Sequence, residues 1–229
     1  MIIGSGLIGS AFNKLKHEFN DVCVYASGVS NSNSSDLFEF KRDHEQLLYF
    51  LSKYSKLRRF YYISTCSMYD FERHNSPYVK HKLNLENLVL GNTNGVVIRL
   101  PQVLGRSTNS QTLTNFIYLS IKNQKPFKLW EKAKRNLIDV DDVVKIVSAL
   151  NLVNINQPIF NVANVKNYKV FDIVLELEKI IGLKAIFQTV NSGSEYEIDI
   201  SSLSILPFDV KSIIDDDYLA NILRKYYFK

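Results

Sequence analysis

Two side chains in the middle of the sequence have the chemistry of a proton-transfer site. Tyr78 and Lys82 stand four residues apart in a segment that begins with Ser76 and Pro77, a pair typical of a helix start. Residues four apart share one helix face, and an ammonium beside a phenol lowers the pKa of the phenol. Because a free tyrosine titrates near pH ~10, such a partner would let Tyr78 exchange a proton near neutral pH. The alternative is an ordinary pair on an exposed helix face.

A hydroxyl group is expected beside this pair. The apolar run at residues 60–63 predicts a buried parallel strand, and Thr65 follows that strand. Open α/β sheets bind their ligands at the carboxyl ends of the strands. We therefore expect Thr65, Tyr78 and Lys82 to lie together as one catalytic group.

A glycine pattern at the start of the chain gives a second signal. A G-x-G-x-x-G sequence follows the apolar residues 1–3, and a helix is expected over residues 11–19. Such glycines permit a tight turn, and the helix N-terminus offers N–H groups to a pyrophosphate. The alternative is a plain glycine-rich turn. The residues predicted here to bind a dinucleotide cofactor are Gly4, Gly6, Leu7, Ile8 and Gly9.

The elements that must position these residues alternate along the chain, as in a parallel sheet covered by helices. Further strands are expected at residues 21–26, 96–100 and 185–190. Helices are expected at residues 38–54, 78–90, 108–122, 171–181 and 215–227, and from residue 143 onward. Pro101 should end the strand before it, because proline cannot continue a central ladder.

Five segments, in this order, resemble motifs of one known family. They are residues 63–70, 76–86, 96–106, 135–147 and 159–164. On these motifs the chain resembles the extended short-chain dehydrogenases/reductases, the NAD-dependent epimerase/dehydratase family that modifies sugar nucleotides.

The resemblance implies an α/β fold with a Rossmann-like parallel sheet and a small C-terminal substrate lobe. The whole chain, residues 1–229, would be one domain of this type. Its core would span about residues 1–125 and 136–165, and its substrate lobe about 126–135 and 166–229.

The resemblance also implies an NAD(P)-dependent oxidoreductase or epimerase that transfers hydride to a nucleotide-activated sugar. Thr65, Tyr78 and Lys82 would be catalytic, with NAD or NADP as cofactor. Further cofactor contacts would come from Ala26, Ser27 and Pro101, besides Tyr78 and Lys82. Candidate substrate contacts are Gln102, Arg106 and Arg135.

Two candidate arginines have other interpretations. Arginine binds a diphosphate through paired hydrogen bonds, which favours Arg135 as the phosphate contact; otherwise it is a surface arginine. Arg99 is expected to form a structural ion pair or backbone contacts, with a substrate role as the alternative.

The chain departs from the family pattern in its first half. It passes from the first helix to the strand at residues 21–26, which resembles the family's fourth strand, so two strand–helix units are missing. No acidic residue follows Ala26 to hold the adenosine ribose, and the glycine turn is one residue tighter than usual. We therefore expect the adenosine half of the cofactor site to be reduced.

The active-site helix differs as well. The family carries an asparagine near the start of the helix at residues 38–54, close to the active site. In this chain Arg42 or Asp43 occupies that region. The alternative is that both are solvent-exposed charges without a role in the site. Cys66 and Ser67 stand where dehydratases carry an acid pair, which disfavours a dehydratase. Asp70 and Glu72 are expected to be surface charges. The alternative function is a non-catalytic or regulatory sugar-nucleotide-binding protein that has lost tight dinucleotide binding.

Composition narrows the remaining classes. The net charge of +5 is spread over 229 residues and favours anionic ligands over nucleic acid. No apolar run is long enough for a transmembrane helix, and no signal peptide is expected. Cys23 and Cys66 are expected to be reduced thiols, as in a cytoplasmic protein. Their spacing does not suggest a metal site. The resemblance implies a homodimer that pairs the helices at residues 38–54 and 78–90 in a four-helix bundle.

Overall fold

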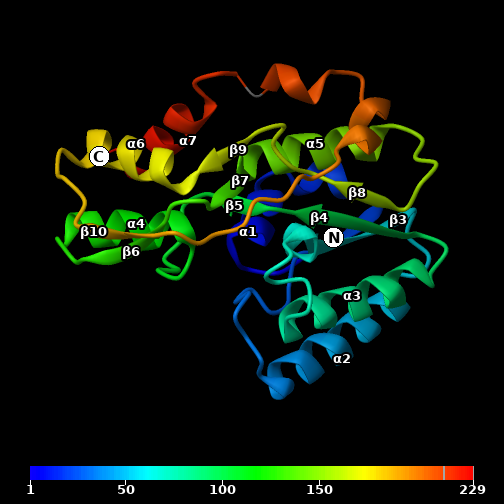
Figure 1. Cartoon of the computed structure of the whole chain (residues 1–229). Helices are drawn as coiled ribbons and strands as arrows, with labels where there is room; N and C mark the ends of the chain where they lie inside the picture. The colour runs from blue at the N-terminus through cyan, green and yellow to red at the C-terminus, as the bar shows by residue number, and fades with distance from the viewer. Residues whose placement is uncertain (214, 229) are drawn as a thin grey trace.

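A parallel sheet forms the centre of the protein, which the computed structural model describes over residues 1–213 and 215–228 (Figure 1). Its strand order is β1–β2–β3–β4–β8, and all neighbours are parallel. The strands are β1 Ile2–Ile3, β2 Val22–Tyr25, β3 Arg59–Thr65, β4 Gly95–Leu100 and β8 Ile159–Asn161. The predicted α/β fold with a Rossmann-like sheet is confirmed, and β4 ends directly before Pro101 as expected.

Helices cover both faces of this sheet. They are α1 (Leu7–Lys14) and α5 (Val140–Leu152) on one face, and α2 (Leu37–Lys53) and α3 (Pro77–Leu90) on the other. Alternate residues of a strand point to opposite sides. Accordingly Val24 and Tyr61 pack with α1 and α5, whereas Tyr25 and Tyr62 pack with α2 and α3.

The first crossover has an unusual hand. Strands β1 to β4 follow one another across the sheet, yet α1 lies on the face opposite to α2 and α3. The β1–α1–β2 connection therefore has the opposite hand to the next two, and such connections are right-handed in about 98% of cases. The same arrangement results when the second and third strands are removed from a doubly wound sheet of order 3-2-1-4-5-6. The topology thus agrees with two missing strand–helix units.

Local sequence signals set the ends of the helices near the site. Ser76 caps α3 by accepting a hydrogen bond from the Val79 amide, and Pro77 is the first helical residue. The helix expected over residues 11–19 begins earlier, at Leu7, and gives way to a 3-10 turn over Lys16–Phe19. The Met1 amino group donates to the Phe19 carbonyl at 3.0 Å and holds that turn against β1.

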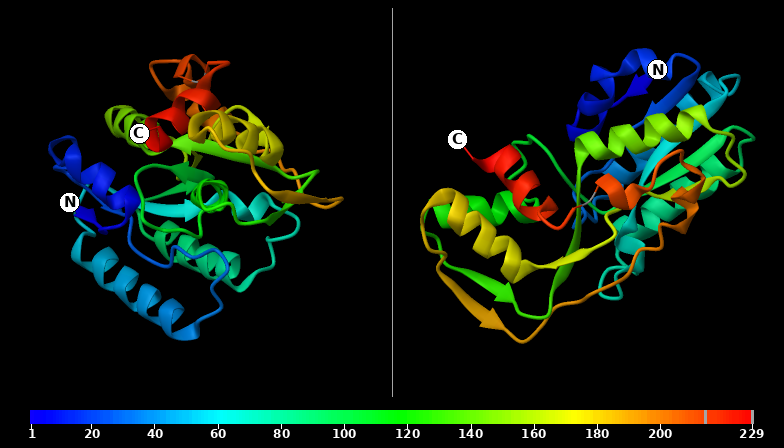
Figure 2. Two further views of the ribbon diagram at one scale, coloured as in Figure 1. Left: turned by 90° about the vertical axis from the view of Figure 1, so that its left-hand side faces the viewer. Right: turned by 90° about the horizontal axis from the view of Figure 1, so that it is seen from above.

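The C-terminal part forms a second layer beside the carboxyl ends of the sheet strands (Figure 2). Its elements are β5 Gln102–Leu104, α4 Leu113–Lys122, β6 Phe127–Trp130, β7 Lys134–Asp139, β9 Asn167–Lys169, α6 Val170–Ile181, β10 Phe187–Val190 and α7 Tyr218–Tyr227. Strands β5, β7 and β9 make one small sheet, and β6 pairs with β10 in another. Gly182 ends α6 with a φ of 75°, as its position predicts.

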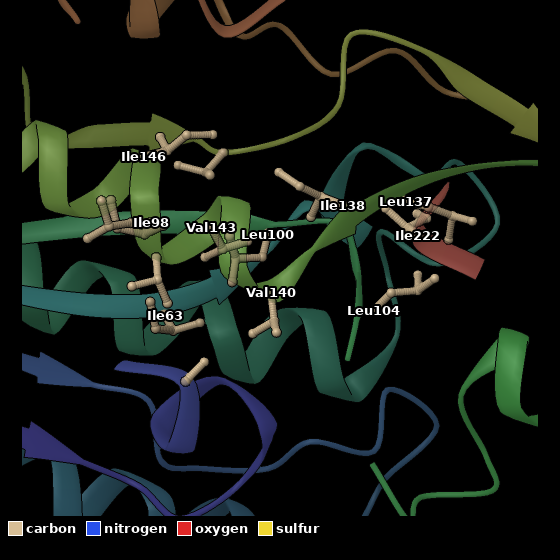
Figure 3. Packing of buried hydrophobic residues seen from close by; sticks show 14 of the residues in the cluster. Ile63, Ile98, Leu100, Leu104, Leu137, Ile138, Val140, Val143, Ile146 and Ile222 are labelled. Atoms are coloured by element: carbon tan, nitrogen blue, oxygen red, sulfur yellow. The ribbon is translucent and has the colours of Figure 1, made fainter. Parts of the chain in front are cut away.

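One hydrophobic core joins the sheet to this C-terminal part (Figure 3). Ile63 and Ile98 come from the sheet, Val143 from α5, and Leu137 and Ile222 from the C-terminal elements, all in the same cluster. The site described below lies where these two parts meet. Of the helices in the described chain, none has the length and apolar content needed to cross a membrane.

Candidate functional site

A cavity of about 420 Å³ lies between the carboxyl ends of β3 and β4 and the C-terminal elements. Cavities of this size hold small ligands. Five of the residues predicted to act in the site line it, namely Thr65, Tyr78, Pro101, Gln102 and Arg135. The structure therefore brings together side chains that lie up to 70 residues apart in the sequence.

Tyr78 lies at the start of α3, with its side chain 8% exposed. Burial raises the pKa of its phenol to about 12, because the phenolate loses its hydration. The nearby Thr65 hydroxyl opposes this rise, and the Asp43 carboxylate adds to it. Thr65 Oγ1 also accepts from the Ser67 amide at 3.0 Å, which fixes its rotamer. The phenol is therefore protonated near neutral pH.

Among the described residues, Lys82 makes no hydrogen bond with that phenol. Its Nζ donates to the Ile63 carbonyl at 2.9 Å and lies 4.5 Å from the centroid of the Tyr62 ring, between α3 and the sheet. Burial lowers the pKa of Lys82 to about 8, against the attraction of Asp43 and Glu86. Lys82 is not among the groups that shift the pKa of Tyr78, and it does not line the cavity. The predicted lowering of the phenol's pKa by this ammonium is thus absent from the described arrangement.

Asp43, not Arg42, faces the interior from α2. Arg42 is exposed, whereas Asp43 is 1% exposed and its Oδ2 lies 2.9 Å from Nε2 of His81. Burial by itself would raise the pKa of Asp43, but the hydrogen bond with His81 and the charge of Lys82 bring it below the usual value. Phe40 stacks on the His81 ring. The carboxylate is therefore paired in a buried network behind Tyr78.

Arg99 forms the structural ion pair expected from the sequence. Its Nη2 lies 2.6 Å from Oε2 of Glu86, which is 2% exposed. Arg99 Nη1 also donates to the Tyr69 hydroxyl, which in turn donates to Asn161 at the end of β8. This network ties α3 to the sheet and keeps Arg99 out of the cavity.

The glycine turn has the predicted form at the end of β1. Gly4 has a φ of +125°, and a Cβ there would lie 2.4 Å from the Ala26 carbonyl oxygen, so only glycine fits. A Cβ on Gly6, the residue that precedes α1, would meet nothing within 4 Å. No side chain caps the helix, so its first N–H groups are open to an anion.

A second hollow, of about 560 Å³, lies at this turn. Gly6, Leu7 and Ser10 line it together with Lys14 and Arg106. Arg106, a predicted substrate contact, therefore lines a different hollow from Gln102, because the loop after β5 carries it toward the glycine turn. Its contact with the substrate stays a prediction. In the described residues the two hollows share no lining residue, so a bound dinucleotide would have to reach from one to the other.

The residues present fit a nicotinamide cofactor in part. An open helix N-terminus flanked by Lys14 and Arg106 suits its phosphates, and the cavity at Tyr78 has room for its reactive ring. The end of β2 is less suitable for the adenosine, because Ala26 leads into Ser27, whose Oγ donates to Gln46. β1 is the edge strand, and no described strand continues the sheet on the adenosine side.

Several residues of the cavity were not found by sequence reasoning. Asp70, expected to be a surface charge, is 2% exposed and lines the cavity. Arg73 and Tyr196 line it as well, and Trp130 and Phe116 add exposed aromatic rings. Asp70 ends the motif segment at residues 63–70, and the other four lie outside the five motif segments. For Asp70, the only indication in the sequence was its position in the polar loop that follows β3.

Comparison with known proteins places these observations in a family. The model of the NAD-dependent epimerase/dehydratase family matches residues 21–163. A comparison with curated proteins found no match.

Solved structures share the fold at low sequence identity. A UDP-N-acetylglucosamine 4-epimerase from Methanobrevibacter ruminantium, in complex with UDP-N-acetylmuramic acid, has a TM-score of 0.74 at 15% identity, over 93% of this chain and 77% of that chain. A UDP-glucuronic acid 4-epimerase from Bacillus cereus, with UDP-glucuronic acid and NAD, has a TM-score of 0.65 at 21% identity, over 92% and 78%. RMD from Pseudomonas aeruginosa, complexed with NADPH, has a TM-score of 0.65 at 17% identity, over 89% and 80%.

These comparisons confirm the resemblance drawn from the motifs, and the family is NAD-dependent by its description, in agreement with the expected cofactor. Because the family model spans more than half of the sequence, this chain belongs to the NAD-dependent epimerase/dehydratase family.

Proposed function

We propose that this protein is an NAD(P)-dependent oxidoreductase or epimerase of a nucleotide-activated sugar, with Tyr78 as its acid and base. The observation that carries the proposal is the placement of Tyr78 and Thr65 in one cavity that also contains Arg135. A phenol and a neighbouring hydroxyl can hold one substrate oxygen between them. This arrangement suits the interconversion of a secondary alcohol and a ketone.

Tyr78 acts on the proton of the substrate oxygen. With its pKa raised to about 12, the phenol is a proton donor at neutral pH, and it can protonate a carbonyl oxygen held by Thr65. In the opposite direction it must first lose its proton, which burial makes costly. The nicotinamide supplies or accepts the hydride when it is bound. Pro101 would border that ring, and Gly4, Gly6, Leu7, Ile8, Gly9, Ala26 and Ser27 would hold the rest of the cofactor.

Arg135 is suited to the diphosphate of the substrate. It is 8% exposed, and its Nη1 donates to the carbonyls of Lys134 and Ser194. In the described chain no carboxylate pairs with it, so a buried cation without a charge partner lines the cavity. A buried charge is costly unless it is paired. A diphosphate would supply both the charge and the acceptors, and Gln102 would contact the sugar.

Coenzyme titration tests the proposal directly. We expect NADH and NADPH to bind with affinities within about tenfold of each other, because no acidic residue follows β2 to select the ribose. Gly6→Ala should keep the fold, since its Cβ meets nothing within 4 Å, but should weaken NADH binding by about tenfold by filling the phosphate approach. Fluorescence titration measures both, with Gly91→Ala at the end of α3 as the control. Equal NADH affinity of Gly6→Ala and the wild type would contradict this cofactor site.

A non-catalytic sugar-nucleotide-binding protein is the second candidate. Two observations favour it, namely the hydrogen bond that Lys82 makes with the Ile63 carbonyl and, among the described residues, the lack of a strand beyond β1 on the adenosine side. If a nucleotide sugar binds while neither NADH nor NADPH binds at millimolar concentration, this second function is correct. A dehydratase is disfavoured within our proposal, because Asp70 is a single acid and Cys66 and Ser67 replace the acid pair.

We also propose a homodimer through α2 and α3. Apolar side chains on the outer face of α2 support it, since Phe38 is 86% exposed, Tyr49 57% and Leu48 44%. Leu48→Glu should shift the protein from dimer to monomer in sedimentation velocity, whereas Leu152→Glu, an exposed leucine at the end of α5, should not. A wild-type monomer at micromolar concentration would refute this proposal.

A further inference from the structure

The carboxylate of Asp70 is the least expected group in the cavity. It is 2% exposed, and only its Oδ1 is used, accepting from Ser194 Oγ at 2.9 Å and from the Glu72 amide at 3.1 Å. In the part of the chain that the structure describes, Oδ2 has no hydrogen-bond partner and no cation lies within 4 Å of the carboxylate. Oδ2 is not among the fully buried unsatisfied atoms of the described residues, so it can be reached from the cavity that Asp70 lines, and a donor on a bound ligand can bond it there.

Ser194 links this carboxylate to Arg135. Its hydroxyl donates to Asp70 and its carbonyl accepts from Arg135 Nη1 at 2.9 Å, so one residue holds both charges at the cavity wall. Tyr196 lines the same wall, and burial raises the pKa of its phenol to about 12, with Asp70 among the smaller causes. The wall therefore presents one buried cation and one buried acceptor a short distance apart.

A ligand that satisfies both groups must carry an anion and a hydrogen-bond donor. We propose that Asp70 determines substrate specificity by accepting a hydrogen bond from a hydroxyl or ammonium group of the sugar, while Arg135 binds the diphosphate. The substrate class is then a nucleotide diphosphate of a neutral or amino sugar, and a uronic acid is excluded. This inference rests on the proposed function and adds the identity of the sugar's polar group.

Charge explains the exclusion. A uronate carboxylate near Asp70 would place two negative charges in a cavity shielded from water, where like charges repel strongly. A hydroxyl or ammonium instead removes the unsatisfied acceptor. Sites built to bond a donor reject ligands that lack it far more strongly than apolar sites reject a change of size. Arg73 lines the same cavity, and its Nη1 donates to Ser32 at 3.0 Å. If a uronate paired with Arg73 instead, the uronate would bind more tightly than the neutral sugar.

Calorimetric titration of sugar pairs tests the assignment. The probes are UDP-glucose against UDP-glucuronate and GDP-mannose against GDP-mannuronate, so that the result does not depend on one nucleobase. We expect the wild type to bind the neutral sugar of the preferred pair at least about tenfold more tightly. Asp70→Asn should reduce this ratio to about threefold or less, because its amide can donate to a carboxylate. The exposed neighbour Glu72→Gln should keep the wild-type ratio.

The outcomes separate this inference from the proposed function. Equal wild-type affinities within a pair, or a ratio unchanged in a folded Asp70→Asn variant, would overturn the role of Asp70 while leaving the nucleotide-sugar function in place. If Asp70→Asn does not fold, the ratio of the wild-type affinities for the neutral sugar and the uronate still tests the role of Asp70, because it needs no variant. Failure of all four probes to bind would remove the proposed function, and this inference with it.

Discussion

Replacing Tyr78 with phenylalanine should lower the turnover number by about 10²–10⁴-fold, the usual contribution of a positioned acid–base group. The fold should persist, because the ring packs with Val29, Phe40 and Val79 and only a hydroxyl is removed. Turnover is followed through NADH absorbance with a nucleotide sugar, and folding through thermal melting. Tyr69→Phe is the matched control, since Tyr69 bonds Arg99 and Asn161 outside the cavity. Wild-type turnover in Tyr78→Phe would show that another group moves the proton.

The same phenol predicts a pH dependence. With a pKa of about 12, Tyr78 remains protonated at pH 7–9, so ketone reduction should vary little over that range. Alcohol oxidation needs the phenolate, and its kcat/KM should rise about tenfold per pH unit. Loss of this slope in Tyr78→Phe would assign it to the phenol. A flat profile for oxidation by the wild type would contradict the assignment.

Replacing Lys82 with methionine should stabilise the fold while it reduces activity. Lys82 is 4% exposed, and its pKa is lowered from 10.5 to about 8, so the folded state disfavours the charged form. A pKa about 2.5 lower in the folded than in the unfolded chain corresponds to roughly 3 kcal/mol. This free energy opposes folding at a pH at which Lys82 is charged in both states. Methionine has similar length and carries no charge to desolvate. We also propose, from the family resemblance, that the ammonium holds the cofactor ribose, and we therefore expect kcat/KM to fall by about tenfold or more.

The sign of this effect follows from linkage. Between about pH 8 and 10.5 the unfolded chain holds a proton on Lys82 that the folded chain has released, so stability should rise with pH in that window. Below about pH 8 the full cost is present. Denaturant unfolding of the wild type and Lys82→Met at pH 7 and pH 10 measures both predictions. Lys80→Met, on the exposed side of the same helix, should change neither stability nor its pH dependence. A Lys82→Met variant less stable than the wild type at pH 7 would contradict the account of Lys82.

The fold was predictable where one local signal decided the structure. Continuous apolar runs predicted β3 and β4, Ser76 and Pro77 predicted the start of α3, and Pro101 predicted the end of β4. Strands β5 and β9 were missed because each has three residues and forms only by pairing with β7. Short segments of this kind carry no periodicity of their own.

The site was predictable as a set of residues but not as a set of contacts. Motif order brought Thr65, Tyr78, Gln102 and Arg135 to one cavity, as expected. The direction of a long side chain depends on its neighbours in space, and Lys82 is the example. A free carbonyl at the end of β3 and the face of an aromatic ring hold its ammonium, and neither is visible from the spacing of Tyr-x-x-x-Lys.

The largest differences between the predicted and the observed site concern loop residues, because their positions also depend on neighbours that are distant in the sequence. The polar sequence around Asp70 is typical of a surface, and its burial results from Ser194, which lies 124 residues away. Arg106 follows a strand too short to be recognised, and that strand turns it toward the glycine turn.

A crystal structure with NADH and a nucleotide sugar bound would test the central claim most directly. We expect the nicotinamide ring beside Pro101, the sugar oxygen within hydrogen-bond distance of both the Tyr78 and Thr65 hydroxyls, and the diphosphate on Arg135. A sugar bound with its reacting carbon away from Tyr78, or a nicotinamide kept out of this cavity while the sugar occupies it, would contradict the account.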